Sequence, residues 1–245
     1  MSSTAPKRRI LVVGEGLQTE YNYFVGFRKA FEKELEATAT SVTVARGKGG
    51  NASNIVQKAI NEVKKFKPNR KRGDRVFLLL DTEGAGRAPE LSAAENLAKK
   101  AGIEIVYSSP AFEYWLLCHF KKIPRTNFKD CAAFIVALNK VWNVCVQDYD
   151  KADQEVFVRL SDSFDVARAQ ALEIDLHHLK TIAAARCTNP SSQVYELIAI
   201  LIGVKTGEKC PLTGTWILVG DTVTVQLNKG DRVPPHNMVA VCWRL

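Results

Sequence analysis

Three acidic residues follow apolar runs in this sequence, and their positions suggest metal chemistry. Glu15 comes shortly after the run at residues 10–13, while Asp81 directly follows the run at residues 76–80, with Glu83 close behind. Unbroken apolar runs of this length are typical of strands that are buried on both faces of a parallel sheet. In extended backbone Asp81 and Glu83 would share one face, so both carboxylates could bind one ion.

The chemistry that these acids predict is metal-assisted attack on a phosphodiester. Hard cations such as Mg²⁺ prefer carboxylate oxygens together with water and phosphate oxygens. A bound metal would polarise the phosphate or activate a water, while one of the acids moves protons. Glu15, Asp81 and Glu83 are therefore predicted to bind Mg²⁺ or Mn²⁺. The alternative interpretation is that acids at strand ends simply cap the helices that follow.

Strands and helices alternate through the first half of the chain. Apolar periodicity predicts strands at residues 10–13, 42–45, 76–80 and 103–107. It predicts helices at residues 21–36, 51–67 and 89–100. This order is typical of an α/β fold in which helices flank a parallel sheet. Ligands of such sheets bind beyond the carboxyl ends of the strands, which is where the acids lie.

Two further segments suit a polyanionic ligand. Residues 47–51 read Gly-Lys-Gly-Gly-Asn, and their backbone amides could hold a phosphate, although a tight strand-to-helix turn explains them equally well. A basic run at residues 64–72 predicts contacts with nucleic acid, because each cation near a phosphate adds affinity. The predicted contacts are Lys48, Lys64, Lys65, Lys67, Arg70, Lys71 and Arg72. A solvated helix end is the alternative interpretation of the run.

Composition narrows the class of protein. The hydrophobic content of 46% supports a sizeable core, and the formal net charge of +8 makes nucleic acid the first candidate partner. The six cysteines form no CxxC pair, and the four histidines have no zinc-ligand spacing. We find neither a secretory signal nor a run long enough to span a membrane. A reducing cytoplasm is therefore the expected compartment.

The second half of the chain changes character twice. Residues from 127 to about 203 look mainly helical, whereas the tail after residue 210 is rich in Thr, Val, Gly and Pro. The tail is predicted to hold strands at residues 215–219, 222–227 and 238–243. We therefore expect three parts, which are an α/β core at 8–126, a helical subdomain at 127–203 and a small β-rich module at 204–245.

Several of these segments together resemble the RloB family, whose fold is related to Toprim nuclease domains. The resemblance covers about residues 8–202, and its most specific segment is the aromatic stretch Ser-Pro-Ala-Phe-Glu-Tyr-Trp-Leu-Leu-Cys-His-Phe at 109–120. The other matching segments are Gly-Glu-Gly-x-x-Thr-Glu-x-x-Tyr-Phe at 14–24, Leu-Asp-Thr-Glu at 80–83, Tyr-x-Lys at 149–151 and Asn-Pro-Ser-x-x-Val-Tyr-x-Leu at 189–197.

The resemblance implies a role for each acid. It implies that residues 8–126 form a Toprim-like catalytic core, that Glu15 is the acid/base, and that Asp81 and Glu83 are the Asp-x-Asp pair that holds Mg²⁺. Here the second Asp of that pair is replaced by Glu83. Glu113 would be a further acid of the site. His119, in the same aromatic segment, is a further candidate for catalysis, with a structural histidine as the alternative.

The tail resembles a small zinc ribbon that has lost its metal ligands. Zinc-binding versions carry two cysteine pairs, and the places of these pairs are taken here by other residues, among them Leu218 and His236. A partial site made of Cys210, His236 and Cys242 is the alternative interpretation, although structural zinc wants four ligands. We expect a docking element that Trp216 and Trp243 stabilise.

Two functions of different classes follow from these observations. The first is a Mg²⁺-dependent nuclease that cleaves RNA, for example tRNA, or DNA as the effector of a bacterial anti-phage or abortive-infection system. The resemblance implies a partner ATPase of the ABC/AAA type that restrains it. The second is a non-catalytic nucleic-acid-binding or scaffold subunit of such a complex. A nucleotide-directed phosphate-ester hydrolase or primase-like enzyme is a third reading, and the oligomeric state stays open.

Overall fold

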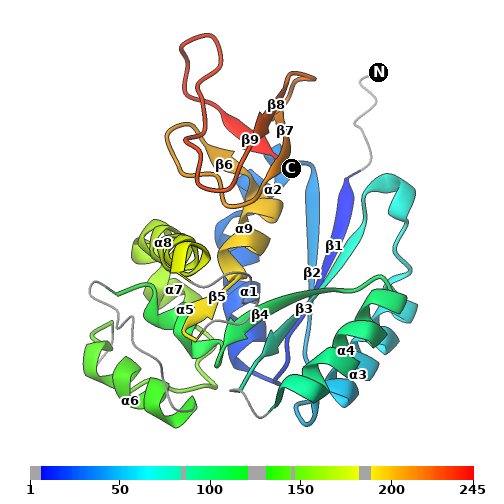
Figure 1. Ribbon diagram of the computed structural model, residues 1–245, viewed down its shortest axis with the longest axis vertical. Coiled ribbons are helices and arrows are strands. Elements are labelled where there is room, and N and C mark those ends of the chain that lie inside the picture. Colours follow the sequence, from blue (N-terminus) through cyan, green and yellow to red (C-terminus); the bar gives the residue numbers. More distant parts are fainter. Residues whose placement is uncertain (1–6, 84–86, 121–130, 145–146, 182–188) are drawn as a thin grey trace.

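The computed structural model describes residues 7–83, 87–120, 131–144, 147–181 and 189–245. At its centre is a five-stranded sheet in the order β2-β1-β3-β4-β5. Its strands are β1 (Arg8–Val13), β2 (Thr40–Ala45), β3 (Arg75–Asp81), β4 (Glu104–Ser109) and β5 (Ser191–Ser192). The first four are parallel and β5 pairs antiparallel to β4. The predicted α/β fold with a parallel sheet is confirmed (Figure 1).

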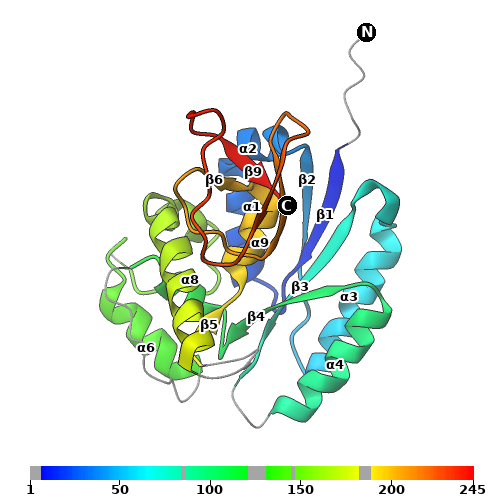
Figure 2. The same ribbon diagram turned by 45° about the horizontal axis from the view of Figure 1, so that its top comes forward.

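Helices cover both faces of this sheet, because successive residues of each buried strand point to opposite sides. Leu11 and Val13 pack against α3 (Ala52–Phe66) and α4 (Ala88–Lys100). Ile10 and Val12 face the opposite core, which contains aromatic residues of α1 (Thr19–Ala30) and α5 (Glu113–Leu117). Figures 1 and 2 both show α3 and α4 on one side of the sheet and α1, α8 and α9 on the other.

The single helix predicted at residues 21–36 is two helices in the structure. α1 ends at Ala30, and α2 (Glu32–Ala37) begins after Phe31, whose φ of −104° and ψ of 28° are not helical. The Phe31 ring stacks on Phe27 with 4.9 Å between the ring centroids and lies 4.6 Å from the ring of Phe164. Phe31 thus packs against aromatic residues at a break in the helix that helical periodicity alone did not predict.

The segment predicted as a helical subdomain shares the core of the sheet. Its helices are α6 (Cys131–Val141), α7 (Val156–Leu160), α8 (Phe164–Thr181) and α9 (Val194–Ile202). One apolar cluster joins strand residues such as Ile10 and Phe77 to Phe157 of α7 and Leu197 of α9. Residues 127–130, 145–146 and 182–188 of the expected segment lie outside the described part of the chain. The described part of this segment therefore forms the second face of the sheet rather than a core of its own.

The C-terminal module is a four-stranded antiparallel sheet in the order β6-β9-β7-β8. Its strands are β6 (Val204–Lys205), β7 (Gly214–Leu218), β8 (Thr224–Leu227) and β9 (Cys242–Arg244). Trp216 and Trp243 are buried at its centre, as predicted. The strand expected from residue 238 begins only at Cys242, and Met238 is 98% exposed with a positive φ. Among the described residues, no helix combines the length and apolarity that crossing a membrane requires.

Lys229 is one of the residues that hold the module against the helical face. Lys229 forms ion pairs with Asp175 of α8 and with Glu196 of α9, where the Nζ–Oε1 distance is 2.8 Å. Its Nζ atom also lies 5.2 Å from the centre of the Tyr195 ring. The side chain is only 18% exposed, so these contacts are shielded from solvent. The module is thus held against α8 and α9, away from the carboxyl ends of β1 and β3 (Figure 1).

Candidate acidic site

The predicted acids converge on one cavity at the carboxyl ends of the strands. Glu15 follows β1, Asp81 and Glu83 lie at the end of β3, and Glu113 begins α5 after β4. All four line a cavity of about 280 Å³, together with Glu20 from the first turn of α1. The parallel topology explains this meeting, because the carboxyl ends of β1, β3 and β4 share one edge of the sheet.

Glu15 is a buried carboxylate that is fixed at both oxygens. Its Oε2 atom accepts a hydrogen bond of 2.6 Å from the backbone N–H of Asp81, and its Oε1 atom lies 3.4 Å from Nη1 of Arg87. Burial raises the pKa of Glu15 to about 7, with smaller contributions from the charges of Glu20 and Glu83. The N–H of Asp81 and the Arg87 guanidinium oppose that rise. A carboxyl group that titrates near neutral pH suits proton transfer.

Asp81 lies at the centre of the acidic cluster. Burial raises its pKa well above the usual range, and the charges of Glu15, Glu20, Glu113 and Glu83 raise it further. Burial raises the pKa of Glu20 as well. Several carboxylates held together away from water repel one another, and a divalent cation would relieve that repulsion.

Glu83 does not share an extended face with Asp81, and the geometric premise of the sequence argument is wrong at this point. β3 ends at Asp81, and Glu83 has a left-handed backbone with φ of 48°. The N–H of Glu83 donates to the carbonyl of Pro110 over 2.9 Å, which holds the turn. The side chain is 56% exposed and forms an ion pair of 3.1 Å with Nη1 of Arg87. Glu83 therefore lies at the rim of the cavity.

Arg87 is a central residue of the site that the sequence analysis did not select. Its Nη1 atom lies 3.4 Å from Oε1 of Glu15 and 3.1 Å from Oε2 of Glu83, and it donates to the carbonyl of Asp81 over 3.1 Å. Its Nη2 atom donates to the carbonyl of Gly50 over 3.1 Å. The side chain is 8% exposed. Its only sequence signal is a position shortly after the Asp81 turn, which many arginines share.

The chemistry of the donor set fits a hard divalent cation, although the carboxylates are not drawn together around one point. Across the described residues, no group of three or more acid, histidine or cysteine side chains is placed to hold a metal ion. The cavity nevertheless gathers oxygen donors from five carboxylates, and burial raises the pKa of Glu15 and Asp81. Glu15, Asp81 and Glu83 are the residues that would hold Mg²⁺ or Mn²⁺.

The glycine-rich loop serves as a tight turn that positions Glu15. The N–H of Gly47 donates to the carbonyl of Gly16 over 2.8 Å, and the N–H of Gly49 donates to the carbonyl of Glu15 over 3.0 Å. A Cβ atom at Gly47 would lie 2.0 Å from the Glu15 carbonyl oxygen, so only glycine fits there. These two amides are used within the protein, which favours the turn over the phosphate cradle. Lys48 is exposed between them.

A cation and a hydroxyl group both contact the carboxylate of Glu113. Its Oε1 atom forms an ion pair of 2.8 Å with Nζ of Lys151 and accepts a bond of 3.4 Å from the Tyr149 hydroxyl group. That hydroxyl group also lies 3.3 Å from Oγ1 of Thr19. Burial alone would lower the pKa of Lys151, but the Glu113 charge and hydrogen bond raise it. Lys151 therefore keeps its positive charge in a cavity that is otherwise lined by acids.

His119 belongs to the core, and its contacts favour the structural interpretation over the catalytic one. The side chain is buried; its Nε2 atom lies 3.1 Å from the Tyr23 hydroxyl group, and its Nδ1 atom lies 3.1 Å from the Trp115 carbonyl. Burial lowers the pKa of His119 to about 4, so the ring is neutral at physiological pH. A neutral ring can donate from Nδ1 and accept at Nε2, which satisfies both nitrogens.

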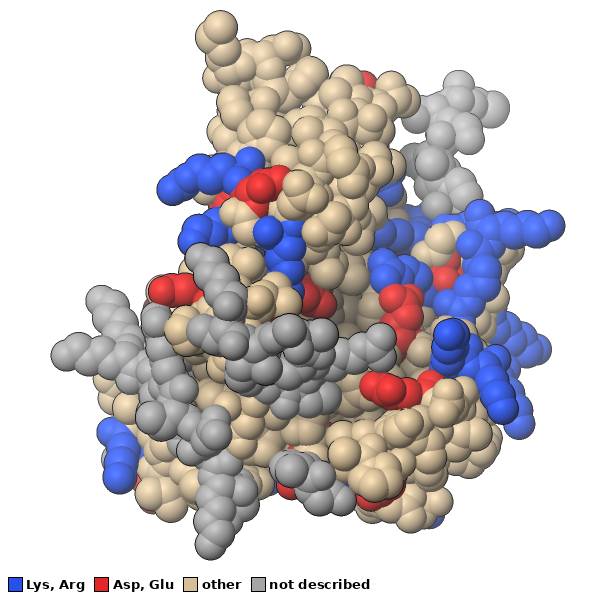
Figure 3. All heavy atoms as spheres, viewed as in Figure 1, with Lys and Arg blue, Asp and Glu red and all other residues tan. Residues whose placement is uncertain are grey.

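The basic run lies at the other end of the sheet from the acids. It spans the end of α3 and the short helix η1 (Arg70–Arg72), immediately before β3 begins at Arg75. Its residues are exposed, and Figure 3 shows lysine and arginine side chains gathered on this part of the surface, at the upper right. Of the predicted nucleic-acid contacts, only Lys48 belongs to a loop that borders the acidic cavity.

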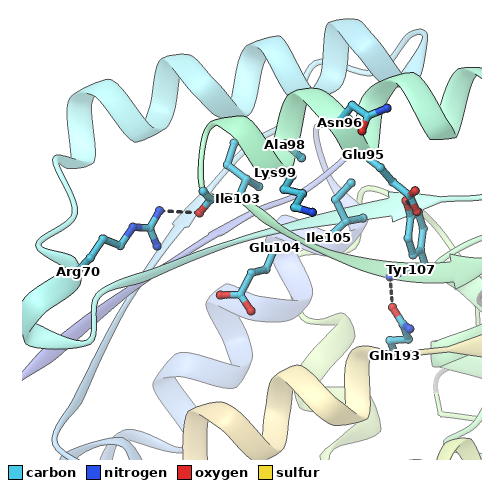
Figure 4. Close-up of a pocket in the computed structure, with 11 residues that line it drawn as sticks. Arg70, Glu95, Asn96, Ala98, Lys99, Ile103, Glu104, Ile105, Tyr107 and Gln193 are labelled. Carbon is cyan, nitrogen blue, oxygen red and sulfur yellow. Dashed lines mark hydrogen bonds between the residues drawn. The ribbon is translucent and has the colours of Figure 1, made fainter.

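A larger cavity of about 750 Å³ lies along the free edge of β4, separate from the acids (Figure 4). β5 pairs only with Ser108 and Ser109, which leaves the earlier part of this strand open. Gln193 closes the edge at Tyr107, whose backbone N–H donates to its side-chain oxygen over 3.0 Å. Charges of both signs line the cavity, from Lys99 to Glu104. Such charges are typical of an edge that is protected against strand addition.

The class of protein is therefore an α/β protein whose parallel sheet carries an acidic cavity at its carboxyl edge. The family model described as RloB-like protein matches residues 10–201, and the chain belongs to the RloB-like family. The match includes the whole five-stranded sheet apart from the start of β1, as well as every acid of the cavity, and it ends before the C-terminal module. No curated protein matches the chain.

Proposed function

We propose that this protein is a divalent-metal-dependent phosphodiesterase that cleaves RNA, for example tRNA, or DNA. The observation that carries the proposal is the convergence of five carboxylates on one cavity in which the pKa of Glu15 is about 7 and that of Asp81 is raised well above its usual range. Membership of the RloB-like family is consistent with a role in defence. The proposal therefore extends to the effector of an anti-phage system, restrained by an ATPase partner.

Several residues of the cavity have distinct proposed roles in the reaction. Mg²⁺ or Mn²⁺ would supply Lewis-acid polarisation of the scissile phosphate. Glu15, with a pKa of about 7, accepts the proton from the attacking water and returns it to the leaving oxygen. The Asp81 carboxylate would hold the cation, and Glu83 would add a donor at the rim. Lys151, at the cavity wall beside Glu113, is placed to attract the phosphodiester.

The positions of these acids at the strand ends support a relation to Toprim domains, which is part of the proposal. A Glu after the first strand and an acidic pair after the third strand lie at adjacent strand ends. Glu83 stands where the pair would have its second Asp, and its carboxylate lies at the rim. A longer side chain on a left-handed backbone still supplies an oxygen donor. The departure from Asp-x-Asp therefore keeps a carboxylate in the pair.

The direct test is cleavage of labelled RNA and DNA by the purified protein with Mg²⁺, Mn²⁺ or EDTA. We expect cleavage of one class of nucleic acid that needs metal and falls by at least about 100-fold in Glu15→Gln, as is typical when a general acid/base is removed. Glu104→Gln is the matched control, because Glu104 lies at the start of β4 and pairs with Arg75 over 2.5 Å. Cleavage that survives both EDTA and Glu15→Gln would contradict the proposal.

A second function is favoured by one observation, which is that no three of the described acids are gathered around one point. The protein would then be a non-catalytic subunit that binds nucleic acid through the basic run. Its signature in the same experiment is binding that weakens steeply with salt, without cleavage under any metal condition.

A further inference from the structure

The Nη1 atom of Arg87 lies against oxygen atoms of the three residues that are proposed to hold the metal. This one nitrogen lies 3.4 Å from Oε1 of Glu15, 3.1 Å from Oε2 of Glu83 and 3.1 Å from the carbonyl oxygen of Asp81. Three residues of the acidic site thus direct oxygen atoms at this guanidinium nitrogen. Two further contacts hold the guanidinium in place, a hydrogen bond of 3.1 Å to the Gly50 carbonyl and an ion pair of 3.6 Å with Glu90.

A guanidinium nitrogen and a divalent cation cannot use these oxygens together. Mg²⁺ binds oxygen at about 2.1 Å, so the carboxylates would need to close in from the distances that they keep around Nη1. Arg87 pairs with Glu83 at the rim of the cavity, and among the described residues no three acids are placed around one point.

We propose that Arg87 is a positioning residue that takes the place of the metal in the free protein and lowers its affinity for divalent cations. Metal binding then requires the guanidinium to withdraw from Glu15 and Glu83. The inference rests on the proposed function, because it concerns the same acids and the same cation. It goes beyond that function by assigning Arg87 control over when the site is loaded.

Substitution of Arg87 by methionine is expected to raise the affinity for metal rather than lower it. Removing an ion-pair partner from buried acids ordinarily weakens a site, but here it removes the competing charge. We expect Mn²⁺, followed by electron paramagnetic resonance of the free ion, to bind Arg87→Met at least about tenfold more tightly than the wild type, because a unit charge this close to the donors repels the ion strongly. Arg87→Lys keeps one charged nitrogen and is expected to bind with intermediate affinity.

Arg168→Met is the matched control for net charge. Arg168 is a similarly shielded arginine, 13% exposed, which pairs with Glu208 over 3.1 Å and with Asp165 over 3.6 Å near the C-terminal module. We expect its Mn²⁺ affinity to equal that of the wild type. The double variant Arg87→Met with Asp81→Asn is expected to lose the tight binding, which places the ion in the acidic cavity. Melting curves with and without Mn²⁺ give a second readout, because a tighter ligand stabilises the folded state more.

The outcomes separate the two proposals. Binding of Mn²⁺ that depends on Asp81 but is no tighter in Arg87→Met or Arg87→Lys would overturn the role of Arg87 and leave the metal site standing. Failure of every variant to bind Mn²⁺ would overturn the metal site and the role of Arg87 together. If Arg87→Met does not fold, the Arg87→Lys comparison decides, since equal or weaker binding in that variant contradicts the inference.

Discussion

The backbone N–H of Asp81 donates a hydrogen bond of 2.6 Å to the carboxylate of Glu15. This bond joins the main chain at the end of β3 to the side chain of Glu15 in the loop after β1, and it fixes the position of the Glu15 carboxylate. It also opposes the effect of burial on the pKa of Glu15. Folding therefore brings acidic groups close together in one cavity, and we expect this to lower the stability of the folded protein.

Asp81→Asn is expected to stabilise the metal-free protein. Folding takes Asp81 out of water beside the charges of Glu15, Glu20 and Glu113, and a neutral amide of similar size avoids that cost. We expect the free energy of unfolding at pH 7.5 to rise by roughly 1–2 kcal/mol, as is common when function places buried charges together. Urea unfolding in EDTA measures the change. A clear loss of stability would show that the Asp81 charge is well compensated.

Asp74→Asn is the matched substitution and is expected to act in the opposite direction. Asp74 accepts hydrogen bonds of 2.8 Å from the backbone N–H groups of Arg9 and Asn69, and it pairs with the Arg9 guanidinium. These bonds and the Arg9 charge outweigh desolvation and lower its pKa. We expect Asp74→Asn to lose about 1–3 kcal/mol in the same unfolding experiment, because an amide replaces a charged acceptor.

Gly47→Ala is expected to damage the site by displacing Glu15. The added Cβ would lie 2.0 Å from the carbonyl oxygen of Glu15 and 2.3 Å from that of Gly14, so backbone must move. We expect a loss of about 2 kcal/mol or more in unfolding free energy, together with loss of metal-dependent cleavage. Gly16→Ala is the control, because its nearest atom is Oε2 of the flexible Glu20 side chain at 3.3 Å. Equal effects of the two substitutions would contradict this explanation.

The buried His119 predicts a pH dependence of stability. Its pKa is about 4 in the folded protein against an ordinary value of 6.5, so the unfolded chain binds the extra proton first as pH falls. The contribution of His119 to the free energy of unfolding is fully present above pH 6.5. It is lost as pH falls towards 4, by roughly 3 kcal/mol. The acids titrate in the same range, so the measurement is the difference between wild type and His119→Gln. A difference that does not vary between pH 7 and pH 4 would show that His119 titrates normally.

Substitutions in the basic run should weaken nucleic-acid binding without changing the chemical step. Lys64, Lys65, Lys71 and Arg72 are exposed at the end of the sheet opposite the acids. Changing all four to glutamine should reduce the slope of log affinity against log salt, by about 0.7–0.9 for each lost phosphate contact. Single-turnover cleavage at saturating protein should stay at the wild-type rate. An unchanged salt slope would show that the run is only a solvated surface.

The sequence by itself determined the sheet and the place where the acids gather. Apolar runs that alternate with amphipathic helices dictate a parallel sheet, and such a sheet brings the ends of β1, β3 and β4 to one edge. Glu15, Asp81 and Glu113 could therefore be assigned to one site, the last of them through the family resemblance. The C-terminal module could also be separated from the rest by composition, with Trp216 and Trp243 at its centre.

Only the tertiary structure decided which groups face one another. Arg87 is 72 residues from Glu15 along the chain, and no local pattern relates the two. The direction of the Glu83 side chain depends on its left-handed φ, and the N–H of Glu83 donates to the Pro110 carbonyl in the same turn. The environment of His119 depends on Tyr23, which lies in α1. Local periodicity sets which face of an element is apolar, whereas contacts between distant elements set the ion pairs, the burial and hence the pKa of each acid.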